Sequence, residues 1–138
     1  MLQNYATGQC LGGLAAGQVF TTLCERGDAH QIWIIADYGT TDAVDGAGRF
    51  TFRNAATGRC LQIYRGSGTA VPGLDTGSCA VDDPAKIIDG VGDGFSSVSL
   101  RGWHDRTNGS AICAASDSTG RAYARTCDGG ADQRWRRR

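Results

Sequence analysis

Apolar residues occur along this chain in short runs, separated by glycine, aspartate, serine and threonine. The segment Phe50–Arg53 alternates apolar and polar residues, and Val98–Arg101 repeats that alternation. A period of two places successive side chains on opposite faces of a strand, so both segments are expected to be strands with one buried face. No segment carries the longer period of an amphipathic helix. The pattern predicts an all-β protein built from many short strands.

One stretch of the chain occurs three times. The first copy, Cys10–Trp33, contains two cysteines and ends in Gln31–Trp33. The third copy, Cys113–Trp135, has the same spacing between its cysteines and ends in Gln133–Trp135. The middle copy, Cys60–Ile88, is longer between its cysteines and lacks the closing Gln-x-Trp. A segment that returns in this way predicts a structural repeat.

Each copy is expected to supply the same set of strands. The phrase Asn-x-Ala-Thr-Gly-x-Cys occurs at Asn4–Cys10 and at Asn54–Cys60, and Asn and Gly in these places favour a tight hairpin turn. This indicates about four strands per copy and about twelve in all. A unit with one apolar face cannot bury that face alone, so three units must share a core. Three blades do not close a propeller, and the expected fold is a β-trefoil of three pseudo-symmetric repeats.

The length of 138 residues fits one domain with one core. We expect a single domain over residues 1–138, with repeats at about 1–46, 47–95 and 96–138. If each copy is one unit, the symmetric disulfide pairing lies within the repeats. The expected bridges are Cys10 with Cys24, Cys60 with Cys79, and Cys113 with Cys127. Such bridges persist in an oxidising compartment, which predicts a secreted, extracellular protein.

Other features bear on the classes of partner. Fourteen basic residues balance fourteen acidic ones, so binding to nucleic acid or to an anionic membrane is not expected. Six arginines nevertheless fall between residues 121 and 138, either as a solvated face or as a basic docking patch. No apolar run is long enough to span a membrane, and the first residues lack the features of a signal peptide. No Cys-x-x-Cys pair is present, and a metal site is not expected.

The Thr-Gly-x-Cys-Leu phrase, the paired cysteines and the closing Gln-x-Trp resemble the ricin-type lectin domain, which also occurs as a carbohydrate-binding module of secreted glycosidases. The resemblance covers essentially the whole chain. It implies that Trp33, Trp135 and, in reduced form, Ile88 pack into the shared core. It also implies that Gln31 and Gln133 brace the binding loops.

The same resemblance implies where sugar would bind. Ricin-type sites use an Asp two residues after the first cysteine, an aromatic residue in the strand leading to the second cysteine, and an Asn shortly before the Gln. The Asp position holds Gly12, Gln62 and Ala115 in the three copies, so no copy keeps that carboxylate. The galactose preference of the family therefore cannot be carried over to this chain.

Candidate sugar-binding residues occur in every copy. The third copy is the best equipped, since a carboxylate can accept sugar hydroxyls and Tyr123 can stack on a sugar ring, although these side chains could equally face water or fill space. Phe20 in the first copy is also a natural core residue. The candidates are Asp117, Tyr123, Arg125, Asp132 and Gln133 in the third copy, Phe20, Thr22, His30 and Gln31 in the first, and Gln62 and Tyr64 in the second. A further exposed candidate is Trp103–Asp105.

Enzyme signatures in the sequence are thin. His104 and Asp105 are adjacent and cannot readily act as base and orienting group of a triad, and no phosphate loop, dinucleotide fingerprint or calcium loop occurs. We therefore expect a monomeric, non-catalytic carbohydrate-binding domain without a cofactor. Its partner would be a glycan or polysaccharide, and it could be attached to a parent enzyme or toxin chain. The alternative is a degenerate β-trefoil that acts as a protein-interaction or inhibitor module.

Overall fold

The computed structural model describes residues 1–39, 47–65, 71–80, 83–102 and 111–138. These residues form twelve antiparallel strands and several single-turn 3₁₀ helices, with no α-helix in the described ranges. The all-β class and the number of strands agree with the sequence pattern. The predicted repeat boundaries are not tested by the structure and stay predictions.

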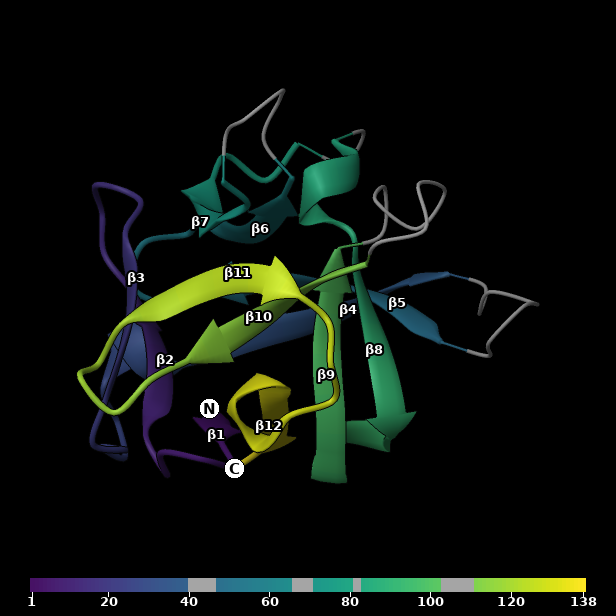
Figure 1. Ribbon diagram of the computed structural model, residues 1–138. Helices are drawn as coiled ribbons and strands as arrows, with labels where there is room; N and C mark the ends of the chain where they lie inside the picture. The colour runs from purple at the N-terminus through teal and green to yellow at the C-terminus, as the bar shows by residue number, and fades with distance from the viewer. Residues whose placement is uncertain (40–46, 66–70, 81–82, 103–110) are drawn as a thin grey trace.

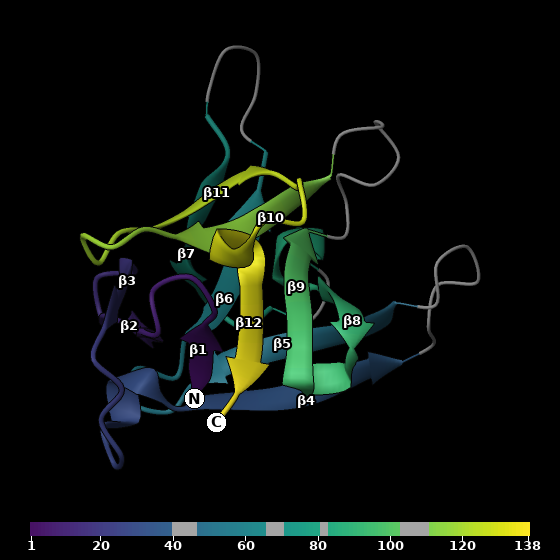
Figure 2. The same cartoon turned by 60° about the horizontal axis from the view of Figure 1, so that its bottom comes forward.

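Six strands form a barrel. Successive hydrogen-bonded pairs join them in the order β1, β12, β9, β8, β5 and β4. Figure 2 shows β1 and β12 side by side, with both chain termini at the same end of the pair. The barrel strands are β1 (Leu2–Asn4), β4 (Trp33–Gly39), β5 (Gly48–Asn54), β8 (Ile88–Asp93), β9 (Ser97–Gly102) and β12 (Arg134–Arg137).

Three hairpins cap the barrel on one side (Figure 1). The first strand of each hairpin carries a cysteine at or next to its start, and this cysteine pairs with a barrel strand. The register is equivalent in the three repeats: Cys10 lies opposite Gln3, Cys60 opposite Arg53, and Cys113 opposite Arg101. This arrangement is a β-trefoil, as predicted. The hairpin strands are β2 (Cys10–Gly13) with β3 (Val19–Thr22), β6 (Cys60–Tyr64) with β7 (Gly73–Gly77), and β10 (Ile112–Ser116) with β11 (Ala122–Thr126).

The core confirms the predicted role of the repeated tryptophans. Trp135 is fully buried and its Nε1–H donates to the carbonyl of Ala114 at 3.1 Å. Trp33 does the same to Leu11 at 2.9 Å. Ile88 occupies the equivalent place in the second repeat, fully buried but without a donor. Each tryptophan therefore ties its barrel strand to the hairpin of its own repeat while filling the shared core.

The predicted turns at Asn4 and Asn54 are present, and they also connect the repeats. The Oδ1 atom of Asn54 accepts from the backbone of Ala56 and Thr57, both at 3.1 Å, which shapes the turn. Its Nδ2 donates to the carbonyl of His30 in the preceding repeat at 2.6 Å. Asn4 is placed in the same way, and its Nδ2 donates to the backbone carbonyl of Asp132 at 2.7 Å. One asparagine thus shapes its own turn and holds the loop of a neighbouring repeat.

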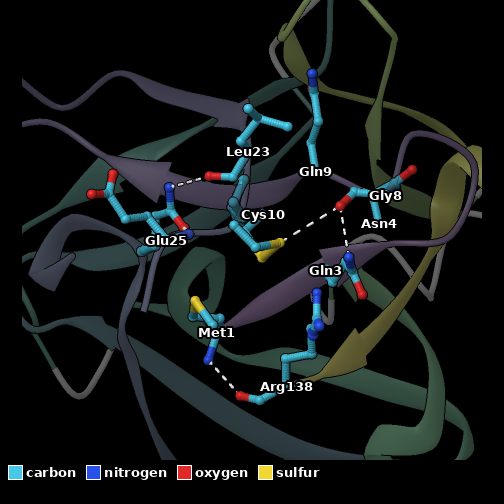
Figure 3. Close-up of a disulfide and its surroundings, with 12 residues drawn as sticks. Met1, Gln3, Asn4, Gly8, Gln9, Cys10, Leu23, Glu25 and Arg138 are labelled. Carbon is cyan, nitrogen blue, oxygen red and sulfur yellow. Dashed lines mark hydrogen bonds between the residues drawn. A yellow bond between two sulfur atoms is a disulfide. The ribbon is translucent and has the colours of Figure 1, made fainter. Parts of the chain in front are cut away.

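The three disulfides pair within the repeats, as the sequence predicts. Cys10 bonds to Cys24, Cys60 to Cys79, and Cys113 to Cys127. Figure 3 shows the first bridge beside the turn at Gly8, whose carbonyl accepts from Nε2 of Gln3 at 2.7 Å. Because each bridge joins the start of a hairpin to the segment after it, each capping hairpin is closed covalently at its base.

Candidate functional site

In two repeats the capping hairpin places an aromatic residue opposite the position of the expected carboxylate. In the first repeat Phe20 lies directly opposite Gly12, and a Cβ atom on Gly12 would lie 2.5 Å from the Phe20 ring. In the third repeat Tyr123 lies opposite Ala115 in the same register. The aromatic ring of Phe20 therefore occupies the space that a carboxylate at position 12 would need.

The second repeat keeps a carboxylate, but on the other strand of its hairpin. Asp75 in β7 lies opposite Gln62 in β6, and Nε2 of Gln62 donates to Oδ1 of Asp75 at 2.5 Å. The hydroxyl of Tyr64 donates to Oδ2 of the same carboxylate at 3.2 Å. The structure therefore brings the two predicted residues of this repeat together around an acid that the sequence prediction missed.

A signal for Asp75 was present in the sequence. Asp75 precedes Cys79 by four residues, as Phe20 precedes Cys24 and Tyr123 precedes Cys127. Counting back from the second cysteine finds the equivalent position in all three repeats. Counting forward from the first cysteine finds only Gln62.

The Asp75 carboxylate borders a surface hollow of about 430 Å³. The other side of the hollow is formed by the turn of the first-repeat hairpin, where the backbone N–H of Thr76 donates to the carbonyl of Gly17 at 2.8 Å. Arg59 reaches the edge of the hollow and donates from Nη2 to the carbonyl of Thr76 at 2.8 Å. The hollow thus combines a carboxylate, an amide and a guanidinium at the boundary between two repeats.

The protonation of Tyr64 suits this arrangement. Burial raises the pKa of Tyr64, and the nearby charge and hydrogen bond of Asp75 raise the pKa further. The phenol therefore stays protonated at neutral pH and remains a donor to the carboxylate. The ring lies over Gly73, where a Cβ atom would come within 2.1 Å of the ring. Only glycine at this position leaves room for Tyr64 to reach Asp75.

The third repeat brings together two of its predicted residues, Arg125 and Asp132, and adds Asp128, which was not predicted. Arg125 donates from Nη2 to Asp132 at 2.7 Å and from Nη1 to Asp128 at 2.6 Å. These hydrogen bonds, that to Asp132 first, raise the pKa of Arg125 above its ordinary value. The guanidinium of Arg121, the residue directly before β11, lies 5.0 Å from the centre of the Tyr123 ring. This repeat thus carries Tyr123, with Arg121 over its ring, and two residues further along β11 the charge-paired Arg125.

Asp117 shapes a turn. Its Oδ1 accepts from the backbone and the hydroxyl of Thr119 and from the backbone of Arg121, and the hydroxyl bond of Thr119 is the main cause that lowers the pKa of Asp117. In the first repeat, Nδ1 of His30 lies 2.9 Å from the carbonyl oxygen of Gly13, and Thr22 is exposed at the end of β3. These residues are not gathered around the hollow. The candidate at residues 103–105 lies outside the described ranges.

The two predicted bracing glutamines are buried and make the same pair of hydrogen bonds. Gln133, in the 3₁₀ helix Ala131–Gln133, donates to the carbonyl of Thr126 and accepts from the backbone of Asp128, both at 2.8 Å. Gln31, in the 3₁₀ helix Ala29–Gln31, makes the equivalent bonds to Leu23 and Glu25, both at 2.9 Å. Each amide therefore holds the loop that follows its hairpin, as the resemblance implied.

Replacing the buried Gln133 with alanine is expected to lower the free energy of unfolding by about 1–3 kcal/mol, because the carbonyl of Thr126 and the N–H of Asp128 would lose their partner and a buried side chain would be removed. Urea denaturation followed by circular dichroism measures this effect. Thr22→Ala is a suitable control, since Thr22 is exposed and its loss should change stability by less than about 0.5 kcal/mol. Equal effects of the two substitutions would contradict the bracing role.

Comparisons with known proteins place these features in a family. The sequence model of the family described as ricin-type beta-trefoil lectin domain-like matches residues 1–73, which is more than half of the chain. The chain belongs to this ricin-type family. The family is one of lectin-like domains that are generally not catalytic.

The structural comparison supports the fold of this ricin-type domain independently. The crystal structure of a designed threefold symmetric protein, ThreeFoil, matches with a TM-score of 0.69 over 98% of this chain and 94% of the designed chain. The sequence identity is 18%, so the likeness concerns the fold alone. No curated protein matches the sequence.

Within the described ranges, no three His, Cys, Asp or Glu side chains gather as they would around a metal ion. No helix in that part of the chain is long and apolar enough to cross a membrane.

Proposed function

We propose that this ricin-type domain is a non-catalytic carbohydrate binder that acts outside the cell through shallow pockets on its capping hairpins. The observation that carries the proposal is the Asp75 carboxylate, held between Gln62 and Tyr64 at the edge of an open hollow. Each carboxylate oxygen has a second lone pair available for a sugar hydroxyl, and the amide of Gln62 can both donate and accept. This set suits the directional hydrogen bonds of adjacent sugar hydroxyls.

The third repeat supplies a second pocket in this proposal, and the prediction that it is the best preserved stays a prediction. Tyr123 offers a ring for stacking, and the paired Arg125 and Asp132 beside it offer a donor and an acceptor. Each shallow pocket alone should bind weakly. Useful affinity would come from two repeats engaging one polysaccharide at once. Three disulfides support an oxidising, extracellular setting.

A glycan array with monosaccharide inhibition tests the proposed function. We expect binding to one class of polysaccharide or cell-surface glycan, inhibited by millimolar amounts of the matching free sugar. Folded protein that binds no glycan on the array but captures a protein partner through a measurable interface would contradict the proposal. That result would support the alternative of a protein-interaction module.

Replacing Tyr123 with alanine should weaken polysaccharide binding about tenfold, because one of two cooperating pockets loses its stacking ring. The effect on stability should be small, since Tyr123 is only partly buried on the hairpin surface. Isothermal titration with the polysaccharide measures the first effect and thermal unfolding the second. Unchanged affinity together with a large loss of stability would show that Tyr123 serves packing alone.

A further inference from the structure

The outer wall of the barrel carries two arginines side by side on β12. Side chains of a strand alternate between its two faces, and Trp135 points into the core. Arg134 and Arg136 therefore lie on the outer face, on the wall formed by β1, β12 and β9 (Figure 2). Neither arginine lines the hollow beside Asp75. Both belong to the arginine-rich stretch of residues 121–138, for which the sequence allowed either a solvated face or a basic docking patch.

Both guanidinium groups are held by neutral partners. Arg136 donates from Nε to Oε1 of Gln3 at 2.6 Å, and its Cζ lies 5.5 Å from the centre of the Tyr5 ring. Arg134 donates to the hydroxyl of Ser97, from Nε at 3.0 Å and from Nη2 at 2.5 Å. Both Nη atoms of Arg136 and Nη1 of Arg134 donate to no residue of the described ranges. These N–H groups are available to an incoming acceptor.

The groups that hold Arg136 are themselves fixed. Gln3 is only 5% exposed, and its Nε2 donates to the carbonyl of Gly8 at 2.7 Å (Figure 3). The hydroxyl of Tyr5 donates to the carbonyl of Ser96 at 2.6 Å, which ties the ring to the neighbouring segment. A guanidinium that is already positioned loses less conformational freedom when it binds a ligand. Its planar fork suits the paired oxygens of a carboxylate or sulfate group.

The positive charge of this wall is not neutralised by the acids near it. Asp132, the nearest acid in the sequence, pairs with Arg125 at 2.7 Å. Asp93 lies opposite Ser97 across β8 and β9, but it forms no ion pair with Arg134. Within the described part of the chain, no carboxylate lies at ion-pair distance from either arginine of the wall. An anionic ligand would therefore not have to displace a carboxylate of the protein.

We propose that Arg134 and Arg136 form a binding site for an anionic polysaccharide, which they recognise through its carboxylate or sulfate groups. Residues two apart on a strand are about 7 Å apart, so the two arginines can contact two anionic groups of one polymer. A nucleic acid fits less well, because the whole chain has no net charge and Arg136 covers one face of the Tyr5 ring on which a base would stack. The site does not require the hairpin pockets to bind sugar.

Three polymers with one backbone test this proposal: dextran, carboxymethyl dextran and dextran sulfate. Surface plasmon resonance at physiological ionic strength should show tighter binding of the charged dextrans than of dextran itself. Arg134→Gln together with Arg136→Gln should weaken that binding at least about tenfold, because both charged forks are lost. The matched control is Arg26→Gln together with Arg53→Gln, which removes the same charge from two exposed arginines elsewhere. It should weaken binding less than about twofold.

The circular dichroism spectrum of the Arg134→Gln, Arg136→Gln variant should match that of the original chain, since both side chains lie on the surface. Should this variant fail to fold, Arg134→Lys together with Arg136→Lys decides instead. Lysine keeps the charge but not the planar fork, so binding of the charged dextrans should still weaken about threefold or more. Unchanged affinity in the lysine variant would then overturn the proposal.

Four other results would overturn it. The charged dextrans could bind no more tightly than dextran, or the two double glutamine variants could weaken binding equally, which would show an effect of net charge alone. A single-stranded oligonucleotide could bind more tightly than either charged dextran and lose its affinity in the Arg134→Gln, Arg136→Gln variant, which would assign the wall to nucleic acid. Finally, the neutral monosaccharide that inhibits the hairpin pockets could displace the charged dextrans, which would place them in those pockets.

Discussion

Replacing Trp135 with alanine is expected to lower the free energy of unfolding by about 3–5 kcal/mol, the range for deleting a large buried aromatic side chain. Trp135 is fully buried in the core, and its removal would leave a cavity on the shared axis. The carbonyl of Ala114 would also lose its donor. Urea denaturation monitored by circular dichroism provides the measurement.

Trp135→Phe separates the two contributions to this loss. Phenylalanine keeps most of the buried volume but cannot donate to Ala114, so its cost should be about 1–3 kcal/mol. A loss below about 1 kcal/mol for Trp135→Ala would show that the three repeats do not depend on a common core. The same pair of substitutions at Trp33 tests the first repeat, where the donor bond goes to Leu11.

Replacing Asp75 with asparagine is expected to weaken glycan binding at the second-repeat hollow by about tenfold to a hundredfold. Asparagine has nearly the same shape but only one acceptor oxygen and no charge, so hydrogen bonds from sugar hydroxyls become fewer and weaker. Titration calorimetry with the glycan found on the array measures the loss. The fold should be retained, because Asp75 is only partly buried on β7.

The pKa of Tyr64 tests independently whether its hydroxyl lies against the Asp75 carboxylate. The charge of Asp75 is one cause that raises the pKa of Tyr64, so Asp75→Asn should lower that pKa toward its ordinary value, as measured by ultraviolet titration. Asp37→Asn is the matched control, since Asp37 is exposed on β4 and does not line the hollow. Full glycan affinity in Asp75→Asn, with the pKa of Tyr64 lowered, would show that the hollow is not the binding site.

Much of the fold could be predicted because the spacing of the cysteines and the repeated motifs are visible in the sequence itself. Two cysteines at equal spacing in two copies, and a third pair in a stretched copy, are enough to assign the three bridges. The family resemblance carried by the Gln-x-Trp motif predicted both the buried tryptophans and the bracing amides of the first and third repeats, where the motif residues face the same way. Asn4 and Asn54 marked their turns for the same reason.

The candidate site was less accessible to prediction because it depends on pairing between strands. Asp75 becomes a neighbour of Gln62 only through the register of β6 with β7, and the insertion between Cys60 and Cys79 hides that register. In the third repeat, Asp117 and Asp132 were chosen as candidates from their positions relative to Cys113 and Gln133. The pairing of Asp132 and Asp128 with Arg125 depends on side-chain geometry that no spacing reveals.

The asparagine at the start of each of the first two repeats has a consequence for how the sites behave. Asn54 holds the carbonyl of His30, next to the amide that braces the loop of the first repeat. Asn4 holds the carbonyl of Asp132, whose carboxylate pairs with Arg125 in the third repeat. The shape of each loop is therefore set by a side chain that belongs to the next unit around the ring. For the glycan sites proposed above, affinity at one repeat would then depend on the folding of the neighbouring repeat, and an isolated repeat would lack a preformed site.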